Sequence, residues 1–148
     1  VEDKLAITRL LDSLGVAYIE AGNPASNPKD MEYFQQIETM TLAHATIVAF
    51  GSTRRKGIKA AQDANVQALL QANAPVCCIF GKSWKLHVTE ILGTTPQENF
   101  AMIGDTVTSR RTGNRFFLTR SISSTAIRTI RRLPWQRCRQ QRTQAPNA

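Results

Sequence analysis

The sequence predicts an α/β fold with a parallel sheet, because one structural unit occurs three times in the first hundred residues. Each unit has an amphipathic stretch, a short apolar run and a polar loop that contains glycine. The apolar runs are residues 16–20, 45–50 and 75–80. A spacing of about 30 residues is the length of a helix plus a parallel strand. Near-continuous apolar runs are typical of strands covered on both faces, and alternating helices and strands form parallel sheets.

Each predicted helix has its own start, stop or periodicity signals. The first has acidic residues in its first turn and Gly15 after its last, which suit the two ends of a helix. The second has Met31, Phe34 and Ile37 on one face. In the last, Thr95 is the predicted N-cap and Pro96 the first helical residue. The predicted helices are residues 2–14, 28–40, 63–71, 86–92 and 96–107, with the apolar runs as the strands between them.

The charge of the chain divides it into two parts. Residues 1–108 contain 9 Lys and Arg against 11 Asp and Glu, a net charge of −2, whereas residues 109–148 contain 10 Arg and no acidic residue. We expect residues 1–108 to form the domain and residues 109–148 to be a poorly ordered basic tail. Such a tail is either an arm that neutralises nucleic-acid phosphates or a segment without a specific partner. A basic nucleic-acid-binding protein is therefore an alternative of another class, although a tail without any Lys makes nucleic acid a poor candidate partner.

Length and composition exclude other classes. A chain of 148 residues can bury a core, but a complete eightfold barrel typically needs about 250 residues. The sequence has no initiator Met, no apolar run long enough for a membrane span and no signal peptide, so we expect a cytoplasmic protein without a membrane partner. Its three cysteines lack the spacing of a disulfide framework or a zinc site, and we expect Cys77 and Cys78 to be buried thiols.

The loops after the three strands are where parallel α/β folds carry chemistry. They read GluAlaGlyAsnPro from residue 20, GlySerThrArgArgLysGly from residue 51 and GlyLysSerTrpLysLeuHis from residue 81. The last of these is not a phosphate-binding P-loop, because Val76 stands where that pattern needs its first glycine.

Residues 1–107 closely resemble the citramalate synthases of the isopropylmalate-synthase-like type. The strings that carry the resemblance are residues 1–5, 18–30, 47–57 and 79–95. That family belongs to the HMG-CoA-lyase-like superfamily of TIM (β/α)8 barrels. The resemblance therefore implies a partial TIM barrel of about three to four βα units.

The resemblance also implies an acyltransferase reaction. Enzymes of this family condense acetyl-CoA with pyruvate to (R)-citramalate, in the biosynthesis of isoleucine and leucine. A divalent metal ion, Mg or Mn, polarises the keto group, and the full-length enzyme is expected to be a homodimer. A 2-isopropylmalate or homocitrate synthase is the alternative within the family.

Two residues are assigned catalytic roles by the resemblance. Glu20 matches a glutamate at the end of the family's second strand, which is expected to orient a catalytic arginine. His87 matches a histidine after the fourth strand that faces the active site. The alternative for Glu20 is a strand-end carboxylate that caps a nearby loop, and without the resemblance a lone histidine such as His87 is more often a structural hydrogen-bonding group. His44 lies outside every matched motif and is expected at the surface.

Other residues of the three loops are predicted to bind substrate through amide, hydroxyl or cationic groups. Arg54, with Arg55 and Lys56, forms a basic cluster that either lies in solvent or acts near the phosphates of coenzyme A or at a subunit contact. The predicted substrate-binding residues are Asn23, Ser52, Thr53, Arg54, Lys82 and Ser83.

The chain also departs from the family. The strand with AspThrThrLeuArgAspGly, which supplies a catalytic arginine and a metal-binding aspartate, and the later HisXxxHis pair are absent. We therefore expect no metal ion bound to this chain and no turnover by it alone.

The tail itself suggests why the family pattern ends. Leu118–Arg131 can be encoded by codons that, read two bases later, spell AspAlaGluHisPhePheAspGlyTyrLys, the segment with which the family continues. We hypothesise a change of reading frame between Thr108 and Arg115. Sequencing the gene tests this hypothesis, which fails if no frame there encodes the family segment.

Overall fold

The computed structural model describes residues 1–109 and the backbone of residues 115–120. Every helix and strand predicted from the sequence is present, with ends that differ by at most a few residues. The elements are α1 (Glu2–Ser13), β1 (Tyr18–Glu20), α2 (Pro28–Ile37), β2 (Thr46–Ser52), the 3-10 turn η1 (Ala60–Gln62), α3 (Ala64–Gln71), β3 (Val76–Gly81), the π-type turn η2 (His87–Ile91), α4 (Pro96–Thr108) and β4 (Arg115–Arg120).

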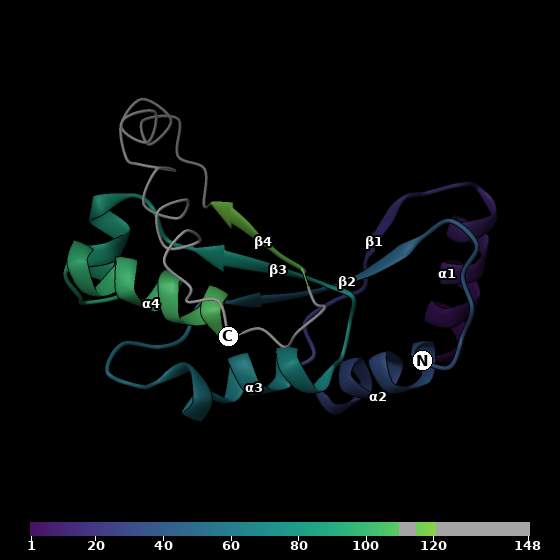
Figure 1. Ribbon diagram of the computed structural model, residues 1–148, viewed down its shortest axis with the longest axis horizontal. Helices are drawn as coiled ribbons and strands as arrows, with labels where there is room; N and C mark the ends of the chain where they lie inside the picture. Colours follow the sequence, from purple (N-terminus) through teal and green to yellow (C-terminus); the bar gives the residue numbers. More distant parts are fainter. Residues whose placement is uncertain (110–114, 121–148) are drawn as a thin grey trace, which may run out of the picture.

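The strands form one parallel sheet in the order β1-β2-β3-β4 (Figure 1). This arrangement confirms the predicted α/β class. The sequence analysis assigned no element to residues 115–120, and here the structure differs: the segment pairs along the whole of β3. Its apolar core is only three residues long between arginines, too short for a strand signal by itself. The rest of the predicted basic tail, apart from Ser109, lies outside the described residues.

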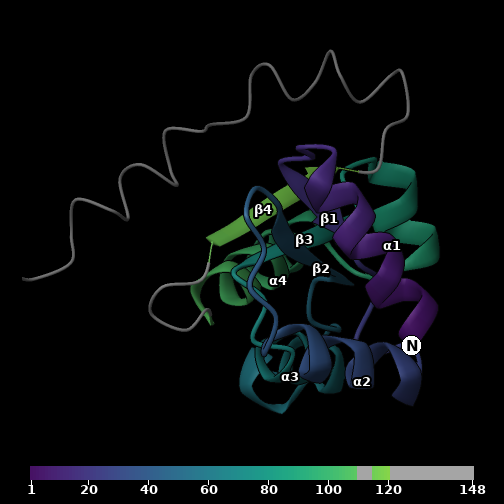
Figure 2. The same cartoon turned by 90° about the vertical axis from the view of Figure 1, so that its right-hand side faces the viewer.

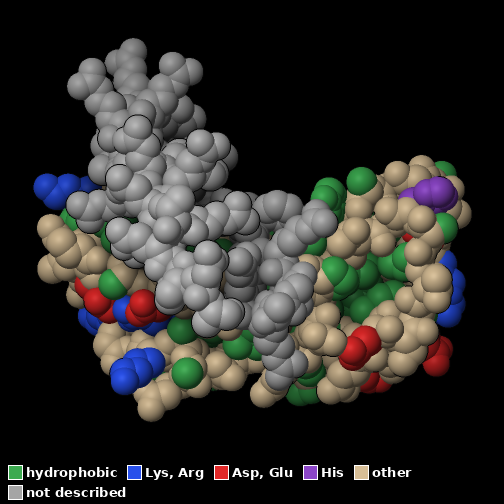
Figure 3. All heavy atoms as spheres, viewed as in Figure 1, with side chains coloured by type: hydrophobic (Ala, Val, Ile, Leu, Met, Phe, Trp, Pro, Cys, Tyr) green, Lys and Arg blue, Asp and Glu red, His purple; other side chains and the backbone are tan. Residues whose placement is uncertain are grey.

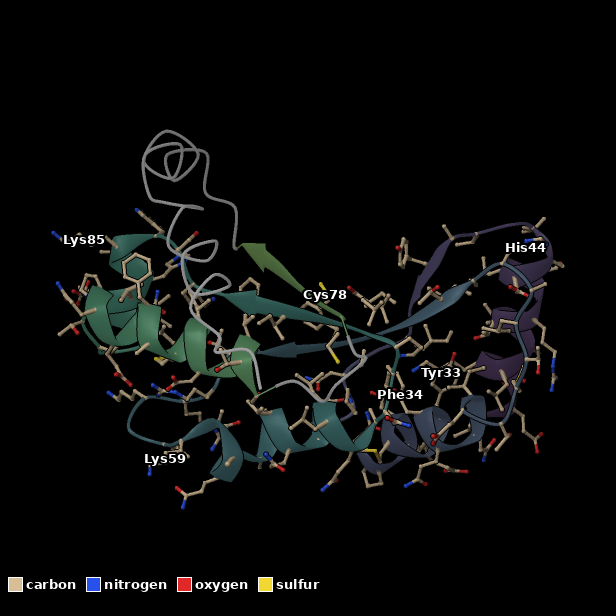
Figure 4. The ribbon with its side chains drawn as sticks, in the orientation of Figure 1. Tyr33, Phe34, His44, Lys59, Cys78 and Lys85 are labelled. Carbon is tan, nitrogen blue, oxygen red and sulfur yellow. The ribbon has the colours of Figure 1, made fainter. Side chains whose placement is uncertain are left out.

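Helices cover one face of the sheet. Figures 1 and 2 show α2 and α3 along this face, with α1 at the β1 end and α4 toward β3 and β4. Tyr33 and Phe34 of α2 are almost fully buried, and Figure 4 shows them between α2 and the sheet. Side chains that alternate along the strands complete this core: Ile19, Ile47, Ala49, Cys77 and Ile79.

Gly51 lets α3 approach this face closely. A Cβ atom at Gly51 would lie 2.6 Å from Cδ1 of Leu69, whose side chain is fully buried. The glycine therefore provides the space that Leu69 fills between α3 and β2.

The opposite face of the sheet has a second, smaller apolar cluster. It contains Val48, Val76 and Cys78, with Phe50 packed against them. Figure 4 shows Cys78 on the side of the sheet away from α2 and α3. In a closed barrel this face would be the interior, so both faces of β2 and β3 are apolar, as their sequences predict.

Side chains with acceptor oxygens fix the starts of the helices. Asn27 accepts from the N–H of Asp30 at the start of α2, and Asp63 accepts from the N–H groups of Asn65 and Val66 at the start of α3. Thr95 caps α4 through the N–H of Glu98, as predicted. Among the described residues, no helix is both long and apolar enough to cross a membrane.

Candidate functional site

The carboxyl-terminal ends of the strands lie together along one border of the sheet, the carboxyl edge. Glu20, the last residue of β1, is level with Val48 of β2, and the N–H of Phe50 donates to the carbonyl of Gly22 beyond β1. The N–H of Thr53 donates to the carbonyl of Phe80 in the same way. The three predicted loops therefore leave the sheet at one edge, in the staggered register of a barrel.

Glu20 is exposed at this edge. Its neighbour Ile19 points into the helix-covered core, so the alternation of the strand puts Glu20 on the opposite face with Val48 and Val76. Val76 is five residues before the end of β3, which corresponds to about 16 Å along the strand. Glu20 and the loop after β3 thus occupy different levels of the edge.

His87 begins the π-type turn η2. The N–H of Leu92 donates to the carbonyl of His87, the i to i+5 bond that defines such a turn. The imidazole ring lies edge-on to the Trp84 ring, with 4.6 Å between the centroids. Its Nδ1 atom is buried and has no hydrogen-bond partner among the described residues. A buried ring nitrogen without a partner is unusual for a purely structural histidine.

The other predicted substrate-binding residues make mainly local contacts. Asn23 accepts from the N–H of Ala25 through its side-chain oxygen, which is the geometry of an Asx turn. The side-chain Nδ2 of Asn65 donates to Oγ of Ser52 over 3.5 Å. The ammonium of Lys82 lies 4.6 Å from the centre of the Phe80 ring. Ser83, next in the chain, is partly buried.

The loop after β2 is held more tightly than the sequence suggested. Four consecutive residues, Thr53 to Lys56, each bond to a different part of the structure. Thr53 bonds to β3 as described, the N–H of Arg54 donates to Oγ1 of Thr106 in α4, and the N–H of Arg55 donates to Oδ2 of Asp63. The ammonium of Lys56 donates to the carbonyl of Gly93, before α4.

Arg54 is the most buried cation of this loop, with 6% of its surface exposed. Its Nε donates to Asp105 and its Nη1 to Glu98, each at 2.8 Å. Burial disfavours the charged guanidinium, but the hydrogen bonds of Glu98 and Asp105 outweigh it and raise the pKa of Arg54. The same contact lowers the pKa of Glu98. The solvent-exposed alternative from the sequence analysis is therefore wrong for Arg54, although Arg55 and Lys56 are exposed.

The described residues do not form a metal centre. In residues 1–109 and 115–120, no three or more His, Cys, Asp or Glu side chains come together in a way that could hold a metal ion. Cys77 and Cys78 are both buried, as predicted, and desolvation raises the pKa of the Cys77 thiol to about 11. Cys77 is therefore protonated at neutral pH and is a poor nucleophile or ligand.

Comparison with known proteins identifies the family. A family model described as HMGL-like matches residues 1–127. The chain belongs to the HMGL-like family. The match continues past residue 108, where the sequence analysis placed the end of the domain, and it includes β4.

Curated relatives of this HMGL-like chain carry two kinds of name. The chain is 50% identical over 107 residues to the (R)-citramalate synthase of Aquifex aeolicus, covering 72% of the chain and 20% of the relative. It is 48% identical over 120 residues to that of Streptomyces coelicolor, covering 80% and 22%. A 2-isopropylmalate synthase of Streptococcus gallolyticus is 33% identical over 111 residues, covering 75% and 20%. The chain thus spans about a fifth of the length of these relatives.

A solved structure supports the barrel fold. An HMG-CoA lyase from Acinetobacter baumannii, in complex with coenzyme A and 3-methylmalate, superposes with a TM-score of 0.58 at 15% identity. The match covers 87% of this chain and 44% of the lyase. At this identity the likeness concerns the fold alone, and it agrees with the prediction of a partial TIM barrel.

Several residues that build the edge were not predicted from the sequence. Asp63 had a recognisable signal, because it stands directly before an amphipathic run as an N-cap should. Thr106, Glu98 and Asp105 gave no such signal, since their partner in the loop lies about 50 residues away in the chain.

Proposed function

We propose that this chain is part of a citramalate synthase, an acyltransferase that condenses acetyl-CoA with pyruvate to (R)-citramalate. The observation that carries the proposal is the contrast in identity: 47–50% to citramalate synthases and 31–33% to 2-isopropylmalate synthases over similar lengths. The basic nucleic-acid-binding alternative receives no support from the relatives named above, which are synthases.

The chemistry needs removal of a proton from the acetyl methyl group and stabilisation of the alkoxide that forms at the keto carbon of pyruvate. We assign Glu20 to orienting a cationic group at the edge, because it is an exposed carboxylate at the end of β1. We assign His87 to acid–base or hydrogen-bonding work, because its Nδ1 is buried without a partner. Arg54 leaves the predicted set of substrate-binding residues, since Glu98 and Asp105 already occupy its guanidinium.

A divalent metal, the homodimer and a cytoplasmic setting remain predictions for the longer enzyme. The described residues do not by themselves provide the ligands of a metal ion. Asn23, Ser52, Thr53, Lys82 and Ser83 remain the candidates for substrate contacts.

A chimera tests the proposal. Residues 1–107 of this chain would replace the matching segment of the Aquifex aeolicus citramalate synthase, and release of coenzyme A would be followed with pyruvate, 2-ketoisovalerate and 2-ketoglutarate. We expect turnover with pyruvate as the preferred keto acid. A folded chimera that prefers another keto acid would refute the substrate assignment.

Point variants of the chimera test the two catalytic assignments. Glu20→Gln and His87→Asn should each lower kcat/KM for pyruvate by about 10²-fold or more, the lower range for a group that acts in proton transfer or charge placement. His44→Asn is the matched control, because the His44 side chain is exposed and lies at the opposite end of the molecule from Lys85 (Figure 4). Lys85 marks the segment after β3 that contains His87. Equal effects at His44 and His87 would remove His87 from the mechanism.

A further inference from the structure

We propose that Arg54 is a positioning residue that fixes the loop after β2 against α4 and so holds Ser52 and Thr53 in place at the carboxyl edge. Its role at this edge rests on the proposed function, whereas the contacts that it makes do not. The sequence left Arg54 either in solvent, near the phosphates of coenzyme A or at a subunit contact, whereas in the structure its guanidinium bonds to Glu98 and Asp105.

The geometry of the guanidinium is the first step. Two of its nitrogens donate to carboxylates that lie seven residues apart on α4, Glu98 and Asp105, which is two helical turns. The same side chain donates from Nη1 to the carbonyl of Arg55 in its own loop. One planar group therefore joins the loop to α4 at two points, and a Lys ammonium could not reproduce this forked arrangement.

The backbone of Arg54 also bonds to α4. Its N–H donates to Oγ1 of Thr106, which is fully buried and in turn donates to the carbonyl of Met102. The loop thus meets α4 through a backbone and a side-chain contact at the same residue. Figure 3 shows acidic and basic side chains next to one another at the end of the molecule where α4 lies.

Charge makes this contact specific. Arg54 is 7% exposed in its side chain, whereas Glu98 and Asp105 are 36% and 53% exposed. The buried member is the cation, so removing either carboxylate leaves part of its charge without a partner. Because the strand-end residues Ser52 and Thr53 directly precede Arg54, displacement of the loop from α4 changes the position of both.

Hydrogen–deuterium exchange of the whole chain tests the proposal. Arg54→Met should speed exchange of the hydrogen-bonded backbone amides of residues 53–55 by about 10-fold or more through local opening, and leave amides of α2 within about twofold of the wild-type rates. In Arg54→Lys, exchange of these loop amides should be faster than in the wild type and slower than in Arg54→Met. Lys59→Met is the matched control, since Lys59 is an exposed cation at the end of the same loop (Figure 4).

The partner side of the contact gives a second, independent readout. The double variant Glu98→Gln with Asp105→Asn should loosen the same amides, and adding Arg54→Met to it should add little. Equal exchange in Arg54→Met and Lys59→Met would overturn the proposal. Loosening that extends equally to α2 would also overturn it, because Arg54 would then support the whole fold. Neither measurement needs a substrate, so failure of the proposed function would leave their results unchanged.

Discussion

The fit of Leu69 against Gly51 gives the sharpest test of the packing between α3 and the sheet. A methyl group added by Gly51→Ala would lie 2.6 Å from Cδ1, 3.0 Å from Cγ and 3.1 Å from Cδ2 of Leu69. Carbon atoms in contact are normally about 3.5–4.0 Å apart. The overlap is therefore close to 1 Å, and it involves Cγ, which a rotation of the terminal methyl groups alone cannot move away.

Leu69 cannot move toward solvent, because its side chain is fully buried in the main core, so any shift presses on other core side chains. Overpacking of this kind destabilises a domain by about 1–3 kcal/mol. For a chain of this size, that loss lowers the melting temperature by roughly 2–12 °C. Thermal and urea unfolding followed by circular dichroism measure both quantities.

Gly104→Ala is the matched control for this substitution. A Cβ at Gly104 has no atom within 4 Å, and the residue is exposed in α4, so the same chemical change should be neutral or stabilise by up to about 1 kcal/mol. Leu69→Ala alone should cost about 2–5 kcal/mol through the cavity that it leaves. In the Gly51→Ala background its cost should be smaller by about 1 kcal/mol or more, since the new methyl group enters that cavity. Equal stability of Gly51→Ala and Gly104→Ala would refute this account of β2 and α3.

Three further results are expected. Backbone N–H groups of Ala43, His44 and Ala45 bond to the Asp12 carboxylate and lower its pKa, so its stabilising effect is present above the ordinary value of 3.8 and is lost as the pH falls through the native pKa. Asp12→Asn should therefore flatten the acid limb of a plot of stability against pH. Cys77, with its pKa of about 11, should resist iodoacetamide at pH 8 until urea unfolds the chain, and early labelling would contradict its burial. Leu10→Lys should change the free energy of unfolding by less than about 0.5 kcal/mol, because Leu10 is 60% exposed on α1 and a charge there stays in solvent.

The order of elements could be predicted because it depends on local pattern. The apolar runs became β1, β2 and β3, and the N-cap predicted at Thr95 is present in α4. The environment of individual side chains could not be predicted, because it depends on contacts between residues far apart in the sequence. Arg54 looked like a loop cation because its two carboxylates are written more than 40 residues later, and only the parallel crossover brings α4 to the loop after β2.

The same distinction applies to the candidate site. A strand-end position for Glu20 follows from the pattern of β1 alone, and the structure agrees. The isolated Nδ1 of His87 does not follow from any pattern, because it depends on how η2 folds beside Trp84. The sequence therefore predicted where the candidate site lies. The burial and the hydrogen-bond partners of each side chain there could be read only from the folded structure.

The β1 end of the sheet has an exposed apolar helix face, and this face indicates what surrounds the chain in the whole protein. Ile7, Leu10 and Leu14 are 57%, 60% and 70% exposed, although they repeat at the spacing of one helix face. Ile7 and Leu10 lie on α1 and Leu14 is its C-cap, and α1 lies next to β1, one of the two edge strands of the described sheet. In a barrel, each strand pairs on both sides and each helix packs between two neighbours, so no such face or edge is left open. An apolar helix face beside an edge strand is therefore the surface expected of βα units that belong to a longer barrel, in agreement with relatives about five times the length of the matched segment.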